Sequence, residues 1–148
     1  MSFAARLAAA CVTFASLHPA LSAADAPQML YMLNCMGCHT ADGGGSPGHV
    51  PSVRATLGPL AADREGRRFL VEVPGVAQSP LSNAAVAELL NWMVRNLTVE
   101  PAEFVEFTPQ EVARYRAQRL TTVYATRAQI LSRISATSAR SPAGDAVH

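Results

Sequence analysis

The pentapeptide Cys35-Met36-Gly37-Cys38-His39 carries the strongest indication of what this chain folds around. Two thiols three positions apart near the end of a helix lie on one side of about a single turn. That spacing lets them bond the two vinyl groups of one haem. A histidine directly after the second thiol can turn its imidazole toward the iron. The pattern therefore predicts a covalent c-type haem on Cys35 and Cys38, with His39 as the proximal axial iron ligand.

Three other interpretations of the two cysteines stay open. A structural zinc site needs a second pair of Cys or His ligands, and only His18, His49 and His148 are left to supply it. A redox-active dithiol of the thioredoxin type needs a preceding strand in an α/β chain. A plain disulfide between Cys35 and Cys38 is the third interpretation.

The first 24 residues have the layout of a secretory signal. Arg6 precedes an apolar run, Leu7 to Leu17, and small residues follow it. Cleavage after Ala24 and after Ser22 fits equally well. The run is shorter than the ~20 residues that a bilayer-spanning helix needs. An uncleaved anchor and a lipoprotein signal ending at Cys11 are the alternatives. We expect a periplasmic or otherwise exported protein that is soluble after cleavage, in a compartment where haem becomes attached covalently.

Composition limits the remaining classes of protein. The chain has 148 residues, 49% of them apolar, and a formal net charge of +1. This length favours one domain. Because there is no basic excess, electrostatics gives no support to a nucleic-acid or anionic-membrane partner. Three cysteines do not make a disulfide-rich scaffold.

Apolar spacing predicts an all-α fold with almost no indication of strands. Helices are expected over 27–37, 64–73, 82–97, from 109 onward and over 123–134, with a glycine-rich loop at 43–48 and a second loop at 76–80. Ser82 is a predicted N-cap, and the sequence from Thr108 to Glu111 is a capping box. Six apolar residues repeat at helical spacing after Ser82: Val86, Leu89, Leu90, Met93, Val94 and Leu97. The predicted organisation is a signal peptide (1–24), a haem domain (25–99), a helical extension (100–134) and a disordered tail (135–148).

The stretch from Pro27 to Leu97 resembles a class I monohaem cytochrome c. Tyr31 stands where that family has an aromatic residue on its first helix, and Trp92 where the last helix packs against it. Gly43-Gly44-Gly45 is similar to the glycine-rich loop after the haem motif. The resemblance implies a cytochrome c-like helical haem domain, and it implies that the carbonyl of Pro51 accepts the axial His39 N–H.

The sequence departs from this family at the sixth iron ligand, which is normally a methionine in a Met-Pro pair. The two candidate pairs here read Val73-Pro74 and Ser79-Pro80. The sixth ligand could be Met93, Gln78, a residue of the extension or a water molecule, or the position could have no ligand.

The ordinary roles of the other candidate ligands are structural. Met93 fits a role in the core, and the core is also the expected place of Met29 and Met32 on the first helix. His49 is expected to be an exposed loop residue.

The expected function is electron transfer by one covalent haem c, with no catalytic residues. An exported dehydrogenase is the expected electron donor, and another cytochrome or a terminal oxidase the acceptor. The alternatives are a haem protein with an open distal site, acting as a ligand binder or peroxidase, and a haem subunit of an exported dehydrogenase complex. Arg54, Arg67 and Arg68 are candidate partners for haem propionates, with a solvated surface as their ordinary role. The extension packs on the haem domain or serves as a docking element.

Overall fold

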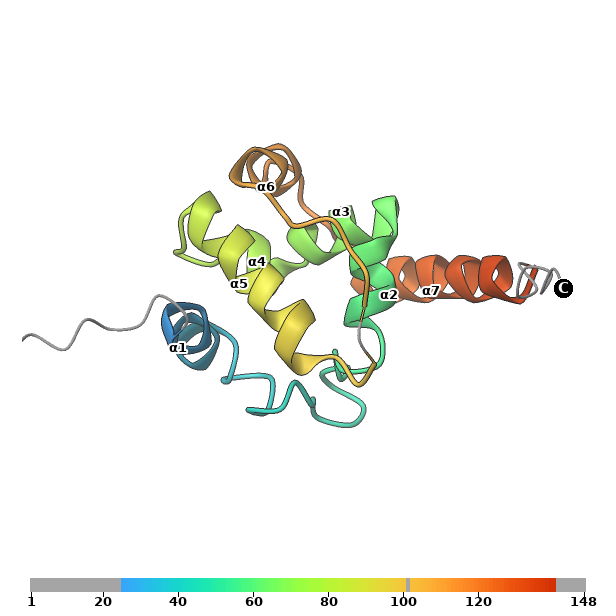
Figure 1. The fold of residues 1–148 in the computed structure, drawn as a ribbon, viewed down its shortest axis with the longest axis horizontal. Helices are drawn as coiled ribbons and strands as arrows, with labels where there is room; N and C mark the ends of the chain where they lie inside the picture. The colour runs from blue at the N-terminus through green and yellow to red at the C-terminus, as the bar shows by residue number, and fades with distance from the viewer. Residues whose placement is uncertain (1–24, 101, 141–148) are drawn as a thin grey trace, which may run out of the picture.

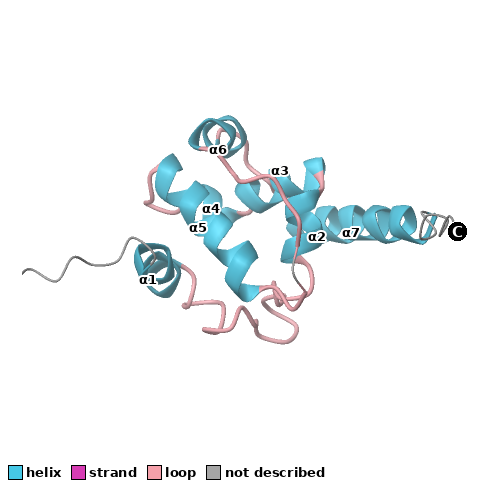
Figure 2. Cartoon of the chain, viewed as in Figure 1, coloured by secondary structure: helices cyan, strands magenta, loops and turns pink. Residues whose placement is uncertain are grey.

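The computed structural model describes residues 25–100 and 102–140. Over these residues the chain forms helices and loops (Figures 1 and 2), and the only extended pairing is an isolated bridge between Ser46 and Val50. The predicted all-α fold class is confirmed. The predicted signal segment lies outside the described residues. The helices are α1 (Asp25–Asn34), α2 (Leu57–Ala62), α3 (Arg64–Glu72), α4 (Pro74–Ala77), α5 (Asn83–Leu97), α6 (Pro109–Arg116) and α7 (Val123–Arg140).

Helix α5 runs through the middle of the molecule (Figure 1) and contributes more buried apolar residues than any other described helix. The Ser82 hydroxyl accepts a hydrogen bond from the Ala85 N–H at 3.2 Å, so the predicted N-cap is confirmed. All six apolar residues of the predicted stripe are buried, at 8% exposure or less. Burial of each such side chain contributes about 1.5–3 kcal/mol to folding. Because the helix must present all six on one face, its apolar periodicity is the clearest helical pattern in the sequence.

Helices α2 and α3 form a tight pair beside α5. Nothing in the local sequence indicates α2, because Gly58 and Pro59 interrupt its short apolar pattern, yet Leu57 and Leu60 are at most 2% exposed. A Cβ on Gly66 would lie 2.3 Å from the Leu60 carbonyl oxygen. A glycine at the start of α3 is therefore needed for the two helices to approach this closely.

The segment after α3 differs in part from the expectation. Helix α3 ends at Glu72, one residue before the predicted end, and its N-cap Asp63 accepts from the Gly66 N–H at 2.8 Å. Pro74 then occupies the first turn of the short helix α4. A proline is well suited to that position because its missing N–H has no partner to lose. The predicted loop from Val76 onward is thus helical up to Ala77.

The extension packs on the rest of the molecule, which is the first of the two roles considered for it from the sequence. Phe107 and Ile130 are 3% and 6% exposed and belong to the same core as α5. The buried Asn91 side chain of α5 donates to the Phe107 carbonyl at 3.1 Å and accepts from its N–H at 2.7 Å. The Thr108 hydroxyl accepts from the Glu111 N–H at 3.2 Å, which confirms the N-cap of α6.

Helix α7 is longer than predicted. It continues through residues 135–140, where the composition predicts the start of a disordered tail. The Thr137 and Ser138 hydroxyls donate to carbonyls four residues back, Arg133 and Ile134, so the polar side chains follow the helix. These six residues are exposed, and the end of α7 projects from the body in Figure 1. The rest of the predicted tail lies outside the described residues. No helix in 25–100 or 102–140 is long and apolar enough to cross a membrane.

Candidate functional site

The pentapeptide continues the last turn of α1 in a helical path. The Cys35 N–H donates to the Tyr31 carbonyl at 2.8 Å, and the N–H groups of Cys38 and His39 donate to the Cys35 carbonyl at 3.1 and 2.9 Å. A backbone that turns in this way keeps the side chains of residues three and four apart on the same side. The two thiols and the imidazole are therefore presented by one turn.

Neither cysteine is in a disulfide. Cys35 is half-buried and Cys38 is exposed. Burial raises the pKa of the Cys35 thiol above its ordinary value, and the neighbouring Cys38 raises it further. Cys35 is thus held as a thiol rather than a thiolate at neutral pH.

His39 points one ring nitrogen at the glycine-rich loop. Its Nδ1 lies 3.1 Å from the Gly44 carbonyl oxygen. Because a carbonyl oxygen only accepts, that nitrogen carries the proton, and Nε2 keeps a lone pair for a metal. The partner differs from the resemblance, which implied Pro51. The loop is tight here, since a Cβ on Gly45 would lie 2.0 Å from the Val50 carbonyl oxygen, and it is the Gly44 carbonyl that lies next to the ring.

The loop after His39 is held by hydrogen bonds between near neighbours. The Val53 N–H donates to the Gly43 carbonyl at 3.0 Å, and Gly43 has a φ of 81°, which favours glycine. The Tyr31 hydroxyl donates to the Thr40 carbonyl at 2.7 Å. The Asp42 carboxylate accepts from the Thr40 hydroxyl, which lowers the pKa of Asp42 below its ordinary value. These bonds join the loop to itself and to the end of α1.

Tyr31 and Trp92 connect α1 to α5. Tyr31 is 1% exposed, and its ring centroid lies 5.7 Å from that of Trp92, with the planes tilted by 41°. This is within the range of favourable aromatic pairs. The aromatic contact that the resemblance implied is therefore present, and it fixes the helix that leads into Cys35.

A cleft of about 320 Å³ opens at the end of α1, next to Cys35 in the chain. Its walls are Asn34 and the segment from α4 to α5: Pro74, Gly75, Gln78, Ser79 and Pro80. Met93 is 7% exposed within the core, which confirms its core role. Gln78 is exposed and lines the cleft. Of the options for a sixth ligand, the cleft thus offers amide and hydroxyl groups only.

One face of α1 is apolar and exposed. Met29, Met32 and Leu33 are 46%, 49% and 74% exposed, and Met36 in the following turn is 37% exposed. The expectation that Met29 and Met32 lie in the core is therefore wrong. Leu30 and Tyr31 instead make the inward contacts of α1.

The candidate propionate partners are all paired within the protein. Arg67 forms a two-pronged ion pair with Glu111, at 2.8 and 2.6 Å, and its guanidinium lies 3.9 Å from the centre of the Phe107 ring. Arg68 pairs with the buried Glu72 at 2.7 Å. Arg54 pairs with the Asp42 carboxylate of the site loop. Arg67 therefore joins the extension to α3, a role that its local sequence does not indicate.

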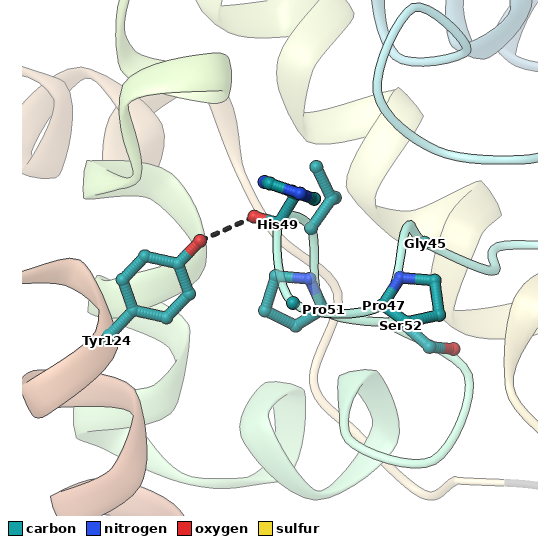
Figure 3. Close-up of a pocket in the computed structure, with 8 residues that line it drawn as sticks. Gly45, Pro47, His49, Pro51, Ser52 and Tyr124 are labelled. Carbon is teal, nitrogen blue, oxygen red and sulfur yellow. Dashed lines mark hydrogen bonds between the residues drawn. The ribbon is translucent and has the colours of Figure 1, made fainter.

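A second cavity, of about 290 Å³, lies between the glycine-rich loop and α7 (Figure 3). Residues of the loop from Gly45 to Ser52 form most of its wall, and Tyr124 of α7 completes it. The Tyr124 hydroxyl donates to the His49 carbonyl. His49 is exposed, as predicted for a loop residue. The contact from Tyr124 is with its backbone, not with its imidazole.

Neither grouped metal ligands nor similarity to known proteins assigns a function to further residues. Within 25–100 and 102–140, no three His, Cys, Asp or Glu side chains are grouped to hold a metal ion. Comparison with family models, curated proteins and solved structures finds no match for this chain. The Cys35–His39 turn is therefore the feature of the molecule from which a function can be inferred.

Proposed function

We propose that this protein is a c-type cytochrome that carries electrons through one covalent haem c. Cys35 and Cys38 would form the two thioether bonds, and His39 would be the proximal ligand. The observation that carries the proposal is the turn itself. One short segment presents two unpaired thiols together with an imidazole whose Nδ1 is hydrogen-bonded to the Gly44 carbonyl. The haem would supply an iron that alternates between the ferric and ferrous states.

The residues around this turn fit such a group. Cys38 is exposed and Cys35 is half-buried, so neither residue is enclosed in the core. The Gly44 carbonyl orients the His39 ring and increases the basicity of Nε2. The cleft next to Cys35 is lined by uncharged residues, and a surrounding of low charge raises a reduction potential. These features support a cytochrome c-like arrangement of α1 and α5.

The proposed setting is the periplasm or another exported compartment. Residues 1–24 support it by their signal-like pattern, and covalent attachment takes place there. An exported dehydrogenase would donate electrons, and another cytochrome or an oxidase would accept them.

The direct test is expression with haem-attachment machinery and export. We expect the mature chain to gain the mass of one haem and to keep it through acid-acetone extraction. Cys35→Ser combined with Cys38→Ser should remove all covalent haem. A wild-type chain that releases its haem to acid acetone, or that holds zinc instead, contradicts the proposal.

The proximal ligand is tested separately. His39→Ala should leave at most an unstable haem protein with an altered spectrum, because no other imidazole is presented by that turn. His49→Ala is the matched control, since its exposed side chain lines only the second cavity, and it should keep the spectrum. An unchanged spectrum in His39→Ala would mean that another residue is the proximal ligand of the iron.

The cleft favours a second candidate function, a haem protein with an open distal site. Its walls offer the amides of Asn34 and Gln78 and the hydroxyl of Ser79, all weak ligands for iron. We expect the ferric protein to lack the weak far-red band of methionine ligation, and the ferrous protein to bind carbon monoxide readily. Met93→Ala should leave both spectra unchanged, because Met93 is in the core.

A further inference from the structure

Arg116, in the last turn of α6, binds the segment that leads from α4 to α5. Its guanidinium donates to the carbonyls of Ser79 at 2.6 Å, Leu81 at 2.7 Å and Ala77 at 3.3 Å. It also reaches the Ser79 hydroxyl at 3.3 Å and the Asn83 side-chain oxygen at 3.2 Å. One side chain thus makes all of these contacts with residues 77–83.

These partners are all neutral oxygens. The half-buried guanidinium therefore interacts with backbone dipoles rather than with a carboxylate. Hydrogen bonds from a charged donor are about twice as strong as neutral ones. The planar fork of arginine reaches several carbonyls at once, which the single ammonium of a lysine does not.

The segment has few other attachments of this kind. Its remaining hydrogen bonds are local: the Gln78 N–H donates to the Pro74 carbonyl at 3.0 Å, and the Ser79 hydroxyl donates to the Val76 carbonyl at 2.9 Å. Those bonds shape the turn but do not tie it to another helix. Among the described residues, its hydrogen bonds to the extension come from Arg116.

The same segment forms one wall of the cleft next to Cys35. Gln78, Ser79 and Pro80 line this cleft together with Asn34. The segment contains no methionine that could attach it to an iron. We propose that Arg116 is a positioning residue that holds residues 77–83 in place, and that through this wall the extension controls ligand access to the second axial position of the haem. The second half of this inference rests on the proposed function.

Amide hydrogen exchange tests whether Arg116 holds the segment. Arg116→Gln removes the charge and the fork, and we expect exchange at residues 78–82 to accelerate by about tenfold or more. Arg116→Lys keeps the charge and should give an intermediate rate. The matched control is Arg114→Gln, on the same helix, whose contact is with the adjacent Tyr115 hydroxyl. Exchange within α5 at residues 86–94 should stay slow in all three, which separates a local effect from general unfolding.

Carbon monoxide rebinding after photolysis tests access. The ferrous wild type should rebind in one phase. Arg116→Gln should rebind several-fold faster or in more than one phase, Arg116→Lys should lie between, and Arg114→Gln should match the wild type. A loss of global stability alone would leave this rate unchanged in the folded protein.

The outcomes separate the two proposals. Faster exchange together with altered rebinding supports the role of Arg116. Unchanged exchange, or altered exchange with wild-type rebinding, overturns it. A wild type without the pyridine haemochrome spectrum of a covalent haem contradicts the proposed function instead, and hydrogen exchange then decides alone whether Arg116 holds the segment.

Discussion

The site loop, residues 35–53, and the extension, residues 102–140, are held together in opposite ways. In the site loop, the His39 ring is hydrogen-bonded to a carbonyl five residues away in the sequence. The Tyr31 hydroxyl of α1 donates to a carbonyl nine residues away. In the extension, Arg133 meets Asp63 across 70 residues and Tyr124 meets His49 across 75. The turn at His39 is therefore shaped by near neighbours, whereas the extension depends on contacts with distant elements, and one of these, from Tyr124 to His49, is made with the site loop.

The largest expected effect tests the extension. Arg67→Ala leaves Glu111 unpaired at a nearly buried site, where the two side chains are 12% and 16% exposed. Removing one partner of such a pair costs about 3 kcal/mol of unfolding free energy or more. Urea unfolding measures it. Arg95→Ala is the control, because its pair with Glu106 is about half exposed, and it should cost less than about 1 kcal/mol. Equal losses would show that the Arg67 pair does not join the extension to the core.

Loss of the helix caps should have a smaller effect, and a similar one in both parts of the molecule. Ser82→Ala and Thr108→Ala each remove the hydroxyl that accepts an N–H at the start of α5 or α6. Each should lower the unfolding free energy by about 1 kcal/mol. Ser132→Ala, an exposed position within α7, is the control and should change little. A much larger loss for Thr108→Ala would mean that the extension unfolds as a unit once its first turn is weakened.

The pair between Asp63 and Arg133 adds a pH dependence. The hydrogen bond from Arg133 lowers the pKa of Asp63 below its ordinary value of about 3.9. A depressed carboxyl pKa stabilises the folded state above the unfolded pKa, and this contribution is lost as pH falls through the folded pKa. Asp63→Asn keeps an N-cap for α3 and removes the charge. Between about pH 6 and pH 2, the unfolding free energy of the variant should fall less steeply than that of the wild type. Parallel curves would contradict a contribution of the Asp63 carboxylate to stability.

The smallest expected effect is at the contact between the two regions. Tyr124→Phe removes the hydroxyl that donates to His49 and keeps the ring. Because Tyr124 is 63% exposed, we expect a loss below about 1 kcal/mol. Calorimetry measures it, with faster hydrogen exchange in residues 46–53 as a second readout. A loss above about 2 kcal/mol would show that the site loop depends on α7 after all.

Sequence alone predicts those parts of the fold that depend on local chemistry. The buried stripe of α5 and the caps Ser82 and Thr108 are recognisable because their signals lie within a few residues. Helix α2 is not, because Gly58 and Pro59 weaken its pattern, and the tertiary packing of its leucines outweighs propensity. The sequence-based prediction places the exposed methionines of α1 in the core by mistake. Apolar spacing indicates an apolar helix face but does not tell which element, if any, covers that face.

The candidate site is predictable to a similar extent. Cys35, Cys38 and His39 lie within five positions, so one turn brings them together. The Gly44 partner of His39 depends on how the loop folds, and Arg116 contacts residues more than 30 positions earlier. No local pattern marks such long-range partners. The ion pair of Arg67 with Glu111 is of the same kind, which is why sequence alone suggests propionates for Arg67 instead.

The path of α7 has a consequence for the order of events during folding. Chains fold from the N-terminus as they emerge, and the hydrogen bonds of the turn at Cys35–His39 join residues between Tyr31 and Gly44. Tyr124 and Arg127 contact that loop and the start of α2 only after the last helix has arrived. The cysteines would therefore be ready for modification while the molecule is still unfinished. Docking of α7 on His49 and Thr56 would then follow the haem attachment proposed for Cys35 and Cys38, as a late step of folding.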